Sequence, residues 1–414
     1  MQAKCRRAFV VLLVLINSSF VEAQLQADPF AGYINSIPIV SKVIEENQDD
    51  KEPVVVNKFV FNSRNSANSI YCVMAYPRKK GIYPAILFLH GGGSCADELL
   101  DKVKHYAAEG YVALAPDLPG IIGVDKIKYS DGPWKSRMKT EKAPRFNIKQ
   151  GVANSILVDA EVAALEAFNY LRTQQNVDVN KIGITGYSWG GYSTTFLAGL
   201  LGTKVKAAYA VFGCGFYDKG TRWTKQVNDM NDEEKTTWLT YLDAGRRAPA
   251  IKAAYFLDAA SNDNFFWPSA VDATLKAIPR TKNHVWNPNL DHVQAAAGPA
   301  MQKLYFDFYL KNKGNPFGIV KIKKIKKTAD GGRDIYIKVD LLKKNNIQKV
   351  ELYYSEKTGK WPDRKWISLP AEKQRRNYYK VPVAKEIVQK DVTYYAYVTD
   401  DRSVSTSSYM YEFD

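Results

Sequence analysis

The chain has 414 residues, which predicts one large domain with a smaller one beside it. With 46% hydrophobic residues, 24% charged residues and no low-complexity tract, its composition excludes a disordered or fibrous protein. The formal charge of +15 would suit an anionic partner, but the lysines are spread along the chain and no nucleic-acid-binding motif is present. We therefore expect a basic solvated surface and no nucleic acid, with contact to an acidic polysaccharide as the weaker alternative.

The N-terminus has the features of a signal peptide. Three positive charges precede an apolar run at residues 8–16, and Val21-Glu22-Ala23 resembles a cleavage site. The apolar run is too short to span a bilayer, and no later segment is long enough. We therefore assign residues 1–23 to a signal peptide and expect a secreted or periplasmic protein without a membrane span.

Cysteine usage argues against a disulfide framework. Three cysteines follow the signal peptide, Cys72, Cys95 and Cys214, and an odd number excludes complete pairing. Cys72 and Cys214 lie in apolar runs, as buried thiols do. No ligand cluster suggests a metal, and we expect no cofactor.

Residues 24–317 are expected to form an α/β domain around a mostly parallel, doubly wound sheet. After a polar N-terminal segment at 24–52, apolar runs of strand type alternate with amphipathic helical stretches, which is the pattern of βαβ units. The expected strands cover residues 54–61, 69–76, 83–90, 111–117, 182–185, 204–212, 251–259 and 284–287. The expected helices cover residues 99–109, 151–172, 269–277 and 295–309.

Two segments interrupt this alternation. Residues 118–150 are rich in glycine, proline and charge, and they follow the carboxyl end of a central strand, where such sheets build substrate sites. Residues 217–247 are helical and polar with two tryptophans, which is typical of an inserted cap.

Residues 318–414 are expected to form a smaller all-β, immunoglobulin-like sandwich. Helical periodicity disappears and short alternating runs take over, at 334–339, 349–354, 366–369, 378–383 and 392–399. The sequence leaves three roles open for this region: carbohydrate contact, packing against the larger domain, or stabilisation.

The pattern Gly186-Tyr-Ser188-Trp-Gly190 follows a short strand and opens an apolar helix. Strand, tight turn and helix are the context in which G-x-S-x-G forms a nucleophile elbow, with glycines where side chains would collide. We therefore predict Ser188 as a nucleophile and the Trp189 N–H group as one oxyanion donor.

A serine nucleophile needs a base, and the chain has four histidines. His90 begins a His-Gly-Gly-Gly run after a strand and is interpreted as shaping an oxyanion loop, whereas His105 is expected on a helix surface. His292 lies in a polar loop from which it can reach over the sheet edge, so it is preferred as the base over His284, which lies within a strand.

The acid that orients the base should follow a strand between the nucleophile and the base. Asp263, in a Ser-Asn-Asp-Asn turn at a strand exit, is preferred to Asp258 within that strand. Asp291 is adjacent to His292, where its side chain should diverge from the ring, and is ranked last.

These motifs in this order resemble the α/β-hydrolase fold, in the branch of dienelactone-hydrolase-like proteins, acetylxylan esterases and prolyl-oligopeptidase-like peptidases. The similarity covers about residues 54–312 and includes the sequences of the segments 110–120 and 261–268. It implies Ser188 as nucleophile, His292 as base and Asp263 as its orienting acid. The N–H groups of Trp189 and Gly92 would form the oxyanion hole, with Gly91 as the less favoured alternative to Gly92.

The resulting hypothesis is a secreted serine hydrolase of carboxylic esters, with acetyl groups on a polysaccharide as the expected substrate. Aromatic residues could form a sugar-stacking wall or an acyl pocket, and those predicted to bind substrate are Trp134, Phe265, Phe266 and Trp267, with Trp223 and Trp238 as further candidates.

A dipeptidyl or prolyl peptidase is the first alternative. It would need an acidic clamp such as Glu233-Glu234, and the short segment before residue 54 cannot build the propeller usual in such peptidases. A non-catalytic binding protein on a hydrolase scaffold is the second alternative.

Overall fold

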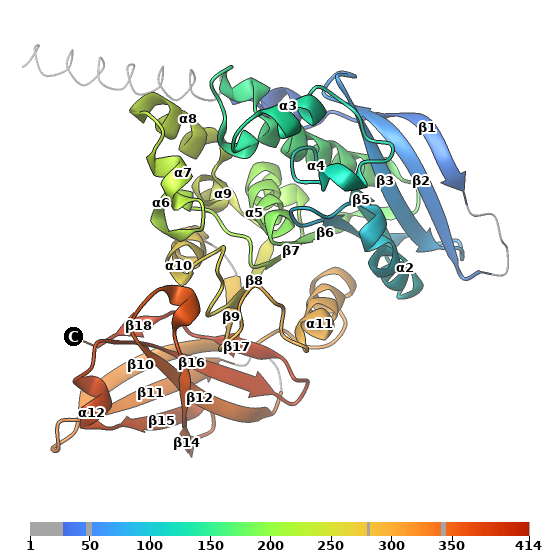
Figure 1. Ribbon diagram of the computed structural model, residues 1–414. Helices are drawn as coiled ribbons and strands as arrows, with labels where there is room; N and C mark the ends of the chain where they lie inside the picture. Colours follow the sequence, from blue (N-terminus) through green and yellow to red (C-terminus); the bar gives the residue numbers. More distant parts are fainter. Residues whose placement is uncertain (1–27, 47–51, 280–281, 341–344, 414) are drawn as a thin grey trace, which may run out of the picture.

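The computed structural model describes residues 28–46, 52–279, 282–340 and 345–413 (Figure 1). The predicted signal peptide at 1–23 therefore lies outside the described residues. Within them, the chain forms one large mixed sheet flanked by helices, followed by two smaller antiparallel sheets.

The large sheet has nine strands in the described residues, in the order β1-β2-β3-β5-β4-β6-β7-β8-β9. The first three are joined in antiparallel pairs, and β3 is also antiparallel to β5. From β5 to β9 every neighbouring pair is parallel. The bounds are β1 (Ile39–Glu46), β2 (Val54–Ser63), β3 (Asn68–Pro77), β4 (Tyr83–Leu89), β5 (Val112–Pro116), β6 (Val177–Tyr187), β7 (Ala207–Val211), β8 (Ala254–Ala260) and β9 (Lys282–Asn287).

The central strands read as continuous apolar runs because helices cover both faces of the sheet. Every residue of β5, β7 and β8 is buried. The helices that cover the two faces are α2 (Leu100–Ala108) with α11 (Gly298–Lys311), and α4 (Ile156–Thr173) with α5 (Trp189–Leu201). Odd and even positions of β6 face different helices. A Cβ on Gly183 would meet Phe306 of α11, whereas a Cβ on Gly186 would meet the backbone of Gly190 in α5. The predicted doubly wound, mostly parallel sheet is therefore confirmed.

Two details of this domain differ from the prediction. β1 lies in the segment to which no strand was assigned. Most of its residues are exposed at the sheet edge, so it lacks the alternating apolar signal. Helix α4 begins at Ile156, five residues later than predicted, because Gly151 has a φ of +92° and a 3-10 turn at Val152–Asn154 comes before the helix. The Ser155 side chain accepts a hydrogen bond from the Leu157 N–H group and caps the helix.

The loop at 118–150 and the cap both contain short helices. The loop includes α3 (Trp134–Thr140), and the cap consists of α6 (Tyr217–Gly220), α7 (Thr224–Asn228), α8 (Asp232–Leu242) and α9 (Ala244–Arg247). In Figure 1 the cap helices α6 to α8 lie on the side of the sheet that is opposite β1. Helix α10 (Pro268–Ala277) follows β8 and contacts α6.

The C-terminal part is a β-sandwich, as predicted. One described sheet has the order β10-β11-β15-β14, and the other contains β13-β12-β16-β17 with β18 added to β16. Apolar side chains from both sheets, including Ile337, Val381, Leu352 and Tyr394, form one core between them. Its strands are β10 (Ile319–Lys327), β11 (Arg333–Asp340), β12 (Ile347–Glu356), β13 (Ile367–Pro370), β14 (Glu372–Arg375), β15 (Tyr378–Val383), β16 (Val392–Asp400), β17 (Ser405–Ser407) and β18 (Tyr411–Glu412). The lysine-rich β10 was not predicted, because most of its side chains are exposed.

The sandwich packs against the free edge of the large sheet at β9 (Figure 1). The Ser407 Oγ accepts a hydrogen bond from the Trp286 N–H group at 2.9 Å, and the His284 Nε2 atom lies 3.0 Å from the Ser408 carbonyl oxygen. Trp366 and Tyr395 of the sandwich belong to the core of the large domain. Of the three roles left open, the structure shows packing against the larger domain.

The three described cysteines are buried and free. None of the helices in the described ranges combines the length and the apolar character needed to cross a bilayer.

The buried histidines make stability depend on pH. Burial lowers the pKa of His284 from 6.5 to about 4, and His90 is affected in the same way. Between these values the unfolded chain binds protons that the folded chain does not, so the stability that is present above pH 6.5 is lost as the pH falls towards 4.

We predict that His284→Gln, which can keep a donor for the Ser408 carbonyl without titrating, loses less stability on acidification than the wild type. The difference in the change of unfolding free energy between pH 7 and pH 5 should be about 2 kcal/mol, measured by urea denaturation. Equal losses in the two proteins would show that His284 is not the titrating group.

Candidate active site

Ser188 occupies a sharp turn between β6 and α5. Its φ of +56° and ψ of −116° are strained for a residue with a side chain. The Ser188 N–H group donates to the Val211 carbonyl oxygen at 2.9 Å, and its carbonyl oxygen accepts from the Tyr192 N–H group at 3.0 Å. These bonds hold the strained residue at the end of the central strand, as the G-x-S-x-G pattern predicted.

The flanking glycines are required by close backbone contacts. A Cβ on Gly190 would lie 2.0 Å from the Leu89 carbonyl oxygen, and one on Gly186 would lie 2.3 Å from the Gly190 carbonyl oxygen. Strand β4, strand β6 and helix α5 therefore meet at a distance that only glycine permits.

His90 shapes the loop that faces Ser188. Its Nε2 atom accepts a hydrogen bond from the Leu118 N–H group at 2.8 Å, so Nδ1 carries the proton and donates to the Gly91 carbonyl oxygen at 2.9 Å. The ring is buried, and desolvation lowers its pKa to about 4, so it stays neutral. Both ring nitrogens of His90 are already hydrogen-bonded to the backbone, so neither is free to accept the Ser188 proton.

The glycines after His90 lie directly against the elbow. A Cβ on Gly91 would be 3.6 Å from the Ser188 Cβ, and one on Gly92 would be 2.8 Å from the Trp189 ring. Within the described residues, neither the Gly91 nor the Gly92 N–H group makes a hydrogen bond. Two unused backbone donors therefore lie beside the predicted nucleophile.

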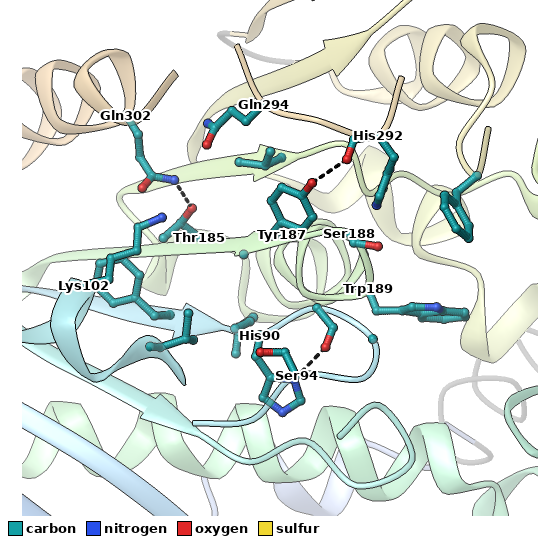
Figure 2. A pocket seen from close by; sticks show the side chains of 18 of the residues that line it. His90, Ser94, Lys102, Thr185, Tyr187, Ser188, Trp189, His292, Gln294 and Gln302 are labelled. Carbon is teal, nitrogen blue, oxygen red and sulfur yellow. Dashed lines mark hydrogen bonds between the residues drawn. The ribbon is translucent and has the colours of Figure 1, made fainter. Parts of the chain in front are cut away.

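His292 and Asp263 lie together at the carboxyl edge of the sheet. The His292 Nδ1 atom is 2.8 Å from the Asp263 Oδ2 atom, and the Asp263 Oδ1 atom accepts from the N–H groups of Phe265 and Phe266. Asp263 is only 1% exposed. Because an ionised carboxylate only accepts, Nδ1 of a neutral His292 carries the proton, which leaves Nε2 as an acceptor. In Figure 2 the His292 ring points towards the Ser188 hydroxyl.

The two other candidate acids have different partners. Asp258 is buried and accepts hydrogen bonds from Tyr209, Asn287 and Gln294. Asp291 is exposed and accepts from the Asn264 N–H group, so it joins the two loops instead of contacting the His292 ring.

The remaining histidines lie elsewhere. His284 is buried in β9 against the sandwich and does not line the cavity beside Ser188, and His105 is exposed on α2.

A cavity of about 560 Å³ opens beside Ser188 (Figure 2). On one side of the serine it has an aromatic mouth, formed by Trp189, Trp223 and Phe265, with the Arg145 guanidinium 4.8 Å above the Trp189 ring. On the other side it runs towards α2 and α11. No aspartate or glutamate is among the residues that line it, which are Phe88, Leu89, His90, Gly91, Gly92, Ser94, Leu99, Lys102, Arg145, Thr185, Gly186, Tyr187, Ser188, Trp189, Val211, Trp223, Phe265, His292, Gln294 and Gln302.

The predicted aromatic wall is only partly present. Phe265 lines the cavity, and Phe266 packs behind it with its ring centroid 6.0 Å from that of His292. Trp134 does not reach the cavity, because α3 turns it into a separate buried cluster with Cys95, Ile122 and Ile156. Neither Trp267 nor Trp238 lines it: Trp267 is the N-cap residue that precedes α10, and Trp238 donates to the Arg145 carbonyl oxygen.

Lys102, Arg145, Gln294 and Gln302 line the cavity but were not predicted as site residues. Lys102 could have been found from its place in the helical pattern. It occupies an apolar position of α2, three residues after Leu99 and four before Tyr106, whereas its neighbours Asp101 and Lys104 are exposed. The other three lie on elements that only the tertiary fold brings to the serine.

The C-terminal sandwich holds the loops of Asp263 and His292. Asn289 donates to the Trp366 carbonyl oxygen at 2.9 Å and accepts from the Trp366 N–H group at 2.8 Å. Asn262, next to Asp263, donates to carbonyl oxygens of the segment Trp361–Arg364. Both loops are therefore tied to one segment of the sandwich.

In the part of the chain that the structure describes, no group of three or more His, Cys, Asp or Glu side chains is arranged to hold a metal.

Comparison with known proteins relates the chain to one family and one fold. The model of the dienelactone hydrolase family matches residues 70–286. Acetyl esterase Axe7A of Xylanibacter ruminicola is 24% identical over 241 residues, which are 54% of this chain and 53% of that protein. The chain thus spans about half the length of this curated relative.

Solved structures show the same fold. The acetyl xylan esterase from Paenibacillus sp. R4 is 20% identical, with a TM-score of 0.57 over 69% of this chain and 94% of its own. Acetyl xylan esterase 1 from Thermoanaerobacterium sp. JW/SL YS485 is 17% identical, with a TM-score of 0.55 over 71% of this chain and 98% of its own. The predicted α/β-hydrolase fold is therefore confirmed.

We predict that Gly190→Ala lowers the unfolding free energy by about 3 kcal/mol, because its Cβ would collide with the Leu89 carbonyl oxygen. Thermal denaturation measures the effect. Gly32→Ala is the matched control, since no atom lies within 4 Å of the added methyl group. Equal melting temperatures for Gly190→Ala and the wild type would contradict the close approach described above.

We also predict that Asn289→Gly lowers kcat at the Ser188 site by about tenfold and leaves KM nearly unchanged, because the His292 loop loses its two bonds to Trp366. Glycine suits the positive φ of 56° at this position, so the backbone stays unstrained. Asn312→Gly, at the same φ on an exposed helix end, should have no effect on kcat. A change in KM alone would argue against a positioning role for Asn289.

Proposed function

This chain belongs to the dienelactone hydrolase family, and on that premise we propose that it is a serine esterase that releases short acyl groups, acetyl above all, from carbohydrate substrates. The observation that carries the proposal is the 2.8 Å contact between His292 Nδ1 and buried Asp263, beside a serine on a strained elbow. This combination supplies a nucleophile, a base and an orienting acid.

In the proposed reaction the Ser188 Oγ atom attacks the ester carbonyl carbon while His292 Nε2 takes the hydroxyl proton. Collapse of the tetrahedral intermediate breaks the bond to the alcohol, which leaves with the proton from His292. Water then attacks the acyl-enzyme with His292 again as base, and the carboxylic acid departs. Asp263 keeps His292 in the tautomer that leaves Nε2 free.

The oxyanion of the intermediate needs donors that are free before the substrate binds. The Trp189 N–H group, at the first position of α5, and the unbonded Gly92 N–H group meet this need, with the Gly91 N–H group as the alternative. The N-terminus of α5 adds a favourable partial positive charge.

Two observations support a sugar ester as the substrate. The aromatic mouth offers Trp223 and Phe265, both half-buried, as surfaces on which a sugar ring can stack. The relatives reported above are named acetyl esterase and acetyl xylan esterase.

The peptidase alternative is less well supported. An amine clamp needs a carboxylate near the nucleophile, and the cavity lining contains none. Glu233 and Glu234 do not line the cavity: Glu233 is exposed on α8, and Glu234 borders a separate hollow next to the 141–149 loop.

We extend the proposal to the organisation of the chain. Residues 1–23 direct export to the periplasm or the medium, residues 24–317 form the catalytic domain, and residues 318–414 form an accessory domain that supports the acid and base loops.

The test is turnover of p-nitrophenyl acetate, acetylated xylan and Ala-Pro-p-nitroanilide by the purified protein. We expect acetate release from both esters and no anilide cleavage, and Ser188→Ala and His292→Ala should each lower turnover by a factor of about a thousand or more. His284→Gln serves as a control that should remain active.

Anilide cleavage at a rate comparable to ester hydrolysis would replace the esterase proposal with a peptidase. Absence of turnover on all three substrates would favour the non-catalytic binding protein. Full activity of Ser188→Ala would refute the assignment of the nucleophile.

A further inference from the structure

The cavity continues past Ser188 into an interior arm, formed by Phe88, Leu99, Lys102, Thr185, Gln294 and Gln302. Figure 2 shows Lys102, Thr185 and Gln302 at one end of the cavity and Trp189 at the other, with Ser188 between them. The arm runs along the sheet face that α2 and α11 cover, since Gln302 of α11 donates to the Thr185 Oγ atom at 2.7 Å. Its walls come from the helices α2 and α11 and from the strands β4 and β6.

Lys102 is the one charged residue that lines the arm. Its Nζ atom lies 5.7 Å from the Phe88 ring, and among the described residues it makes no hydrogen bond and no ion pair. Other lysines in the described residues, such as Lys303 and Lys357, do have carboxylate partners. An ammonium group without an anion inside a cavity is unfavourable unless a ligand supplies one.

The carboxylate that attracts Lys102 makes no ion pair with it within the described residues. Asp258 attracts the ammonium group, but its two oxygens already accept hydrogen bonds from Asn287, Gln294 and Tyr209. Phe88 of β4, Thr185 of β6 and Gln302 of α11, which also line the arm, are uncharged. Burial outweighs the attraction of Asp258 and lowers the pKa of Lys102 from 10.5 to about 8.

The register of the sheet gives the scale of a group that could bridge Ser188 and Lys102. The Phe88 ring lies under the ammonium group, and Phe88 pairs with Thr185, three residues before Ser188 along β6. The backbone positions of Thr185 and Ser188 are therefore about 10 Å apart. A group of this scale that ends in a charge-assisted hydrogen bond of about 2.8 Å is an acyl chain of a few carbons bound to the Ser188 Oγ atom.

We propose that the interior arm receives the acyl part of the ester and that Lys102 pairs with a carboxylate at its end, so that half-esters of short dicarboxylic acids, such as glutaryl esters, are substrates. The inference rests on the proposed function, since it uses the same nucleophile. The sugar or other alcohol stays in the aromatic mouth, where Trp223 and Phe265 offer stacking surfaces. Hydrolysis of a half-ester yields the alcohol and the dicarboxylate, with water as the only co-reactant, and Lys102 is unchanged.

The experiment compares two methyl esters that differ only at the far end of the acyl chain, monomethyl glutarate and methyl pentanoate, with methanol release as the readout. We expect the wild type to have a kcat/KM about tenfold higher for the glutarate ester, as a buried charge-assisted hydrogen bond would give. Lys102→Met should abolish this preference, and Lys102→Arg should keep part of it. Lys104→Met, which removes an exposed lysine from the same helix, should retain the full preference.

The pH dependence of the wild type provides a readout that needs no variant. The glutarate preference should be present below pH 8 and decline as the pH rises through that value, because the free Lys102 then loses its charge. Lys102→Met should show no such decline. Its melting temperature at pH 7 should equal or exceed that of the wild type, since a half-buried ammonium group without an ion-pair partner is removed.

The outcomes separate this inference from the proposed function. Hydrolysis of p-nitrophenyl acetate by the wild type without a preference for glutarate over pentanoate overturns the inference alone, as does a preference that survives in Lys102→Met. A wild type that hydrolyses no ester overturns both.

Discussion

The close approach of three backbone segments at Ser188 is the constraint on which the site depends. The carbonyl oxygen of Leu89 lies where a side chain at Gly190 would be, and the Gly190 carbonyl oxygen lies where one at Gly186 would be. This contact places the end of β4, and with it the loop of Gly91 and Gly92, against the first turn of α5. A strained serine and two unused backbone donors are thus brought together by main-chain packing, without help from a flexible side chain.

Around this rigid centre the cavity is asymmetric. On one side of Ser188 it is aromatic, and on the other it contains the Lys102 ammonium group. Its lining contains Lys102 and Arg145 but no acidic residue, so its electrostatic potential favours electron-rich substrates throughout. The positive charge also favours the developing oxyanion of any ester that reacts there.

Much of this arrangement could be predicted from the sequence, because local rules produce it. The parallel strands are apolar runs, the elbow is a short motif, and the loop positions of Asp263 and His292 follow from the strand order. What could not be predicted depends on tertiary contacts. Most residues of β1 and β10 are exposed, so their sequences lack the alternation of apolar and polar residues that indicates a strand. The sequence around Trp134 does not show that its side chain packs into a separate cluster, because that depends on the position of α3. Lys102 differs from these cases, because its place on the apolar face of α2 is visible in the helical pattern, although charges on amphipathic helices usually face solvent.

The contacts between β9 and the end of the chain have a consequence for the order of synthesis. The partner of the Trp286 N–H group is Ser407, 121 residues later, and the His284 ring contacts the carbonyl oxygen of Ser408. Trp366, which holds the His292 loop, is also made after the whole large sheet. During translation, Ser188 is therefore synthesised long before Trp366, the residue that holds the His292 loop. Fragments that end before Trp366 would carry Ser188 with a His292 loop that lacks its two bonds to the sandwich, so the proposed activity would depend on the C-terminal sheets.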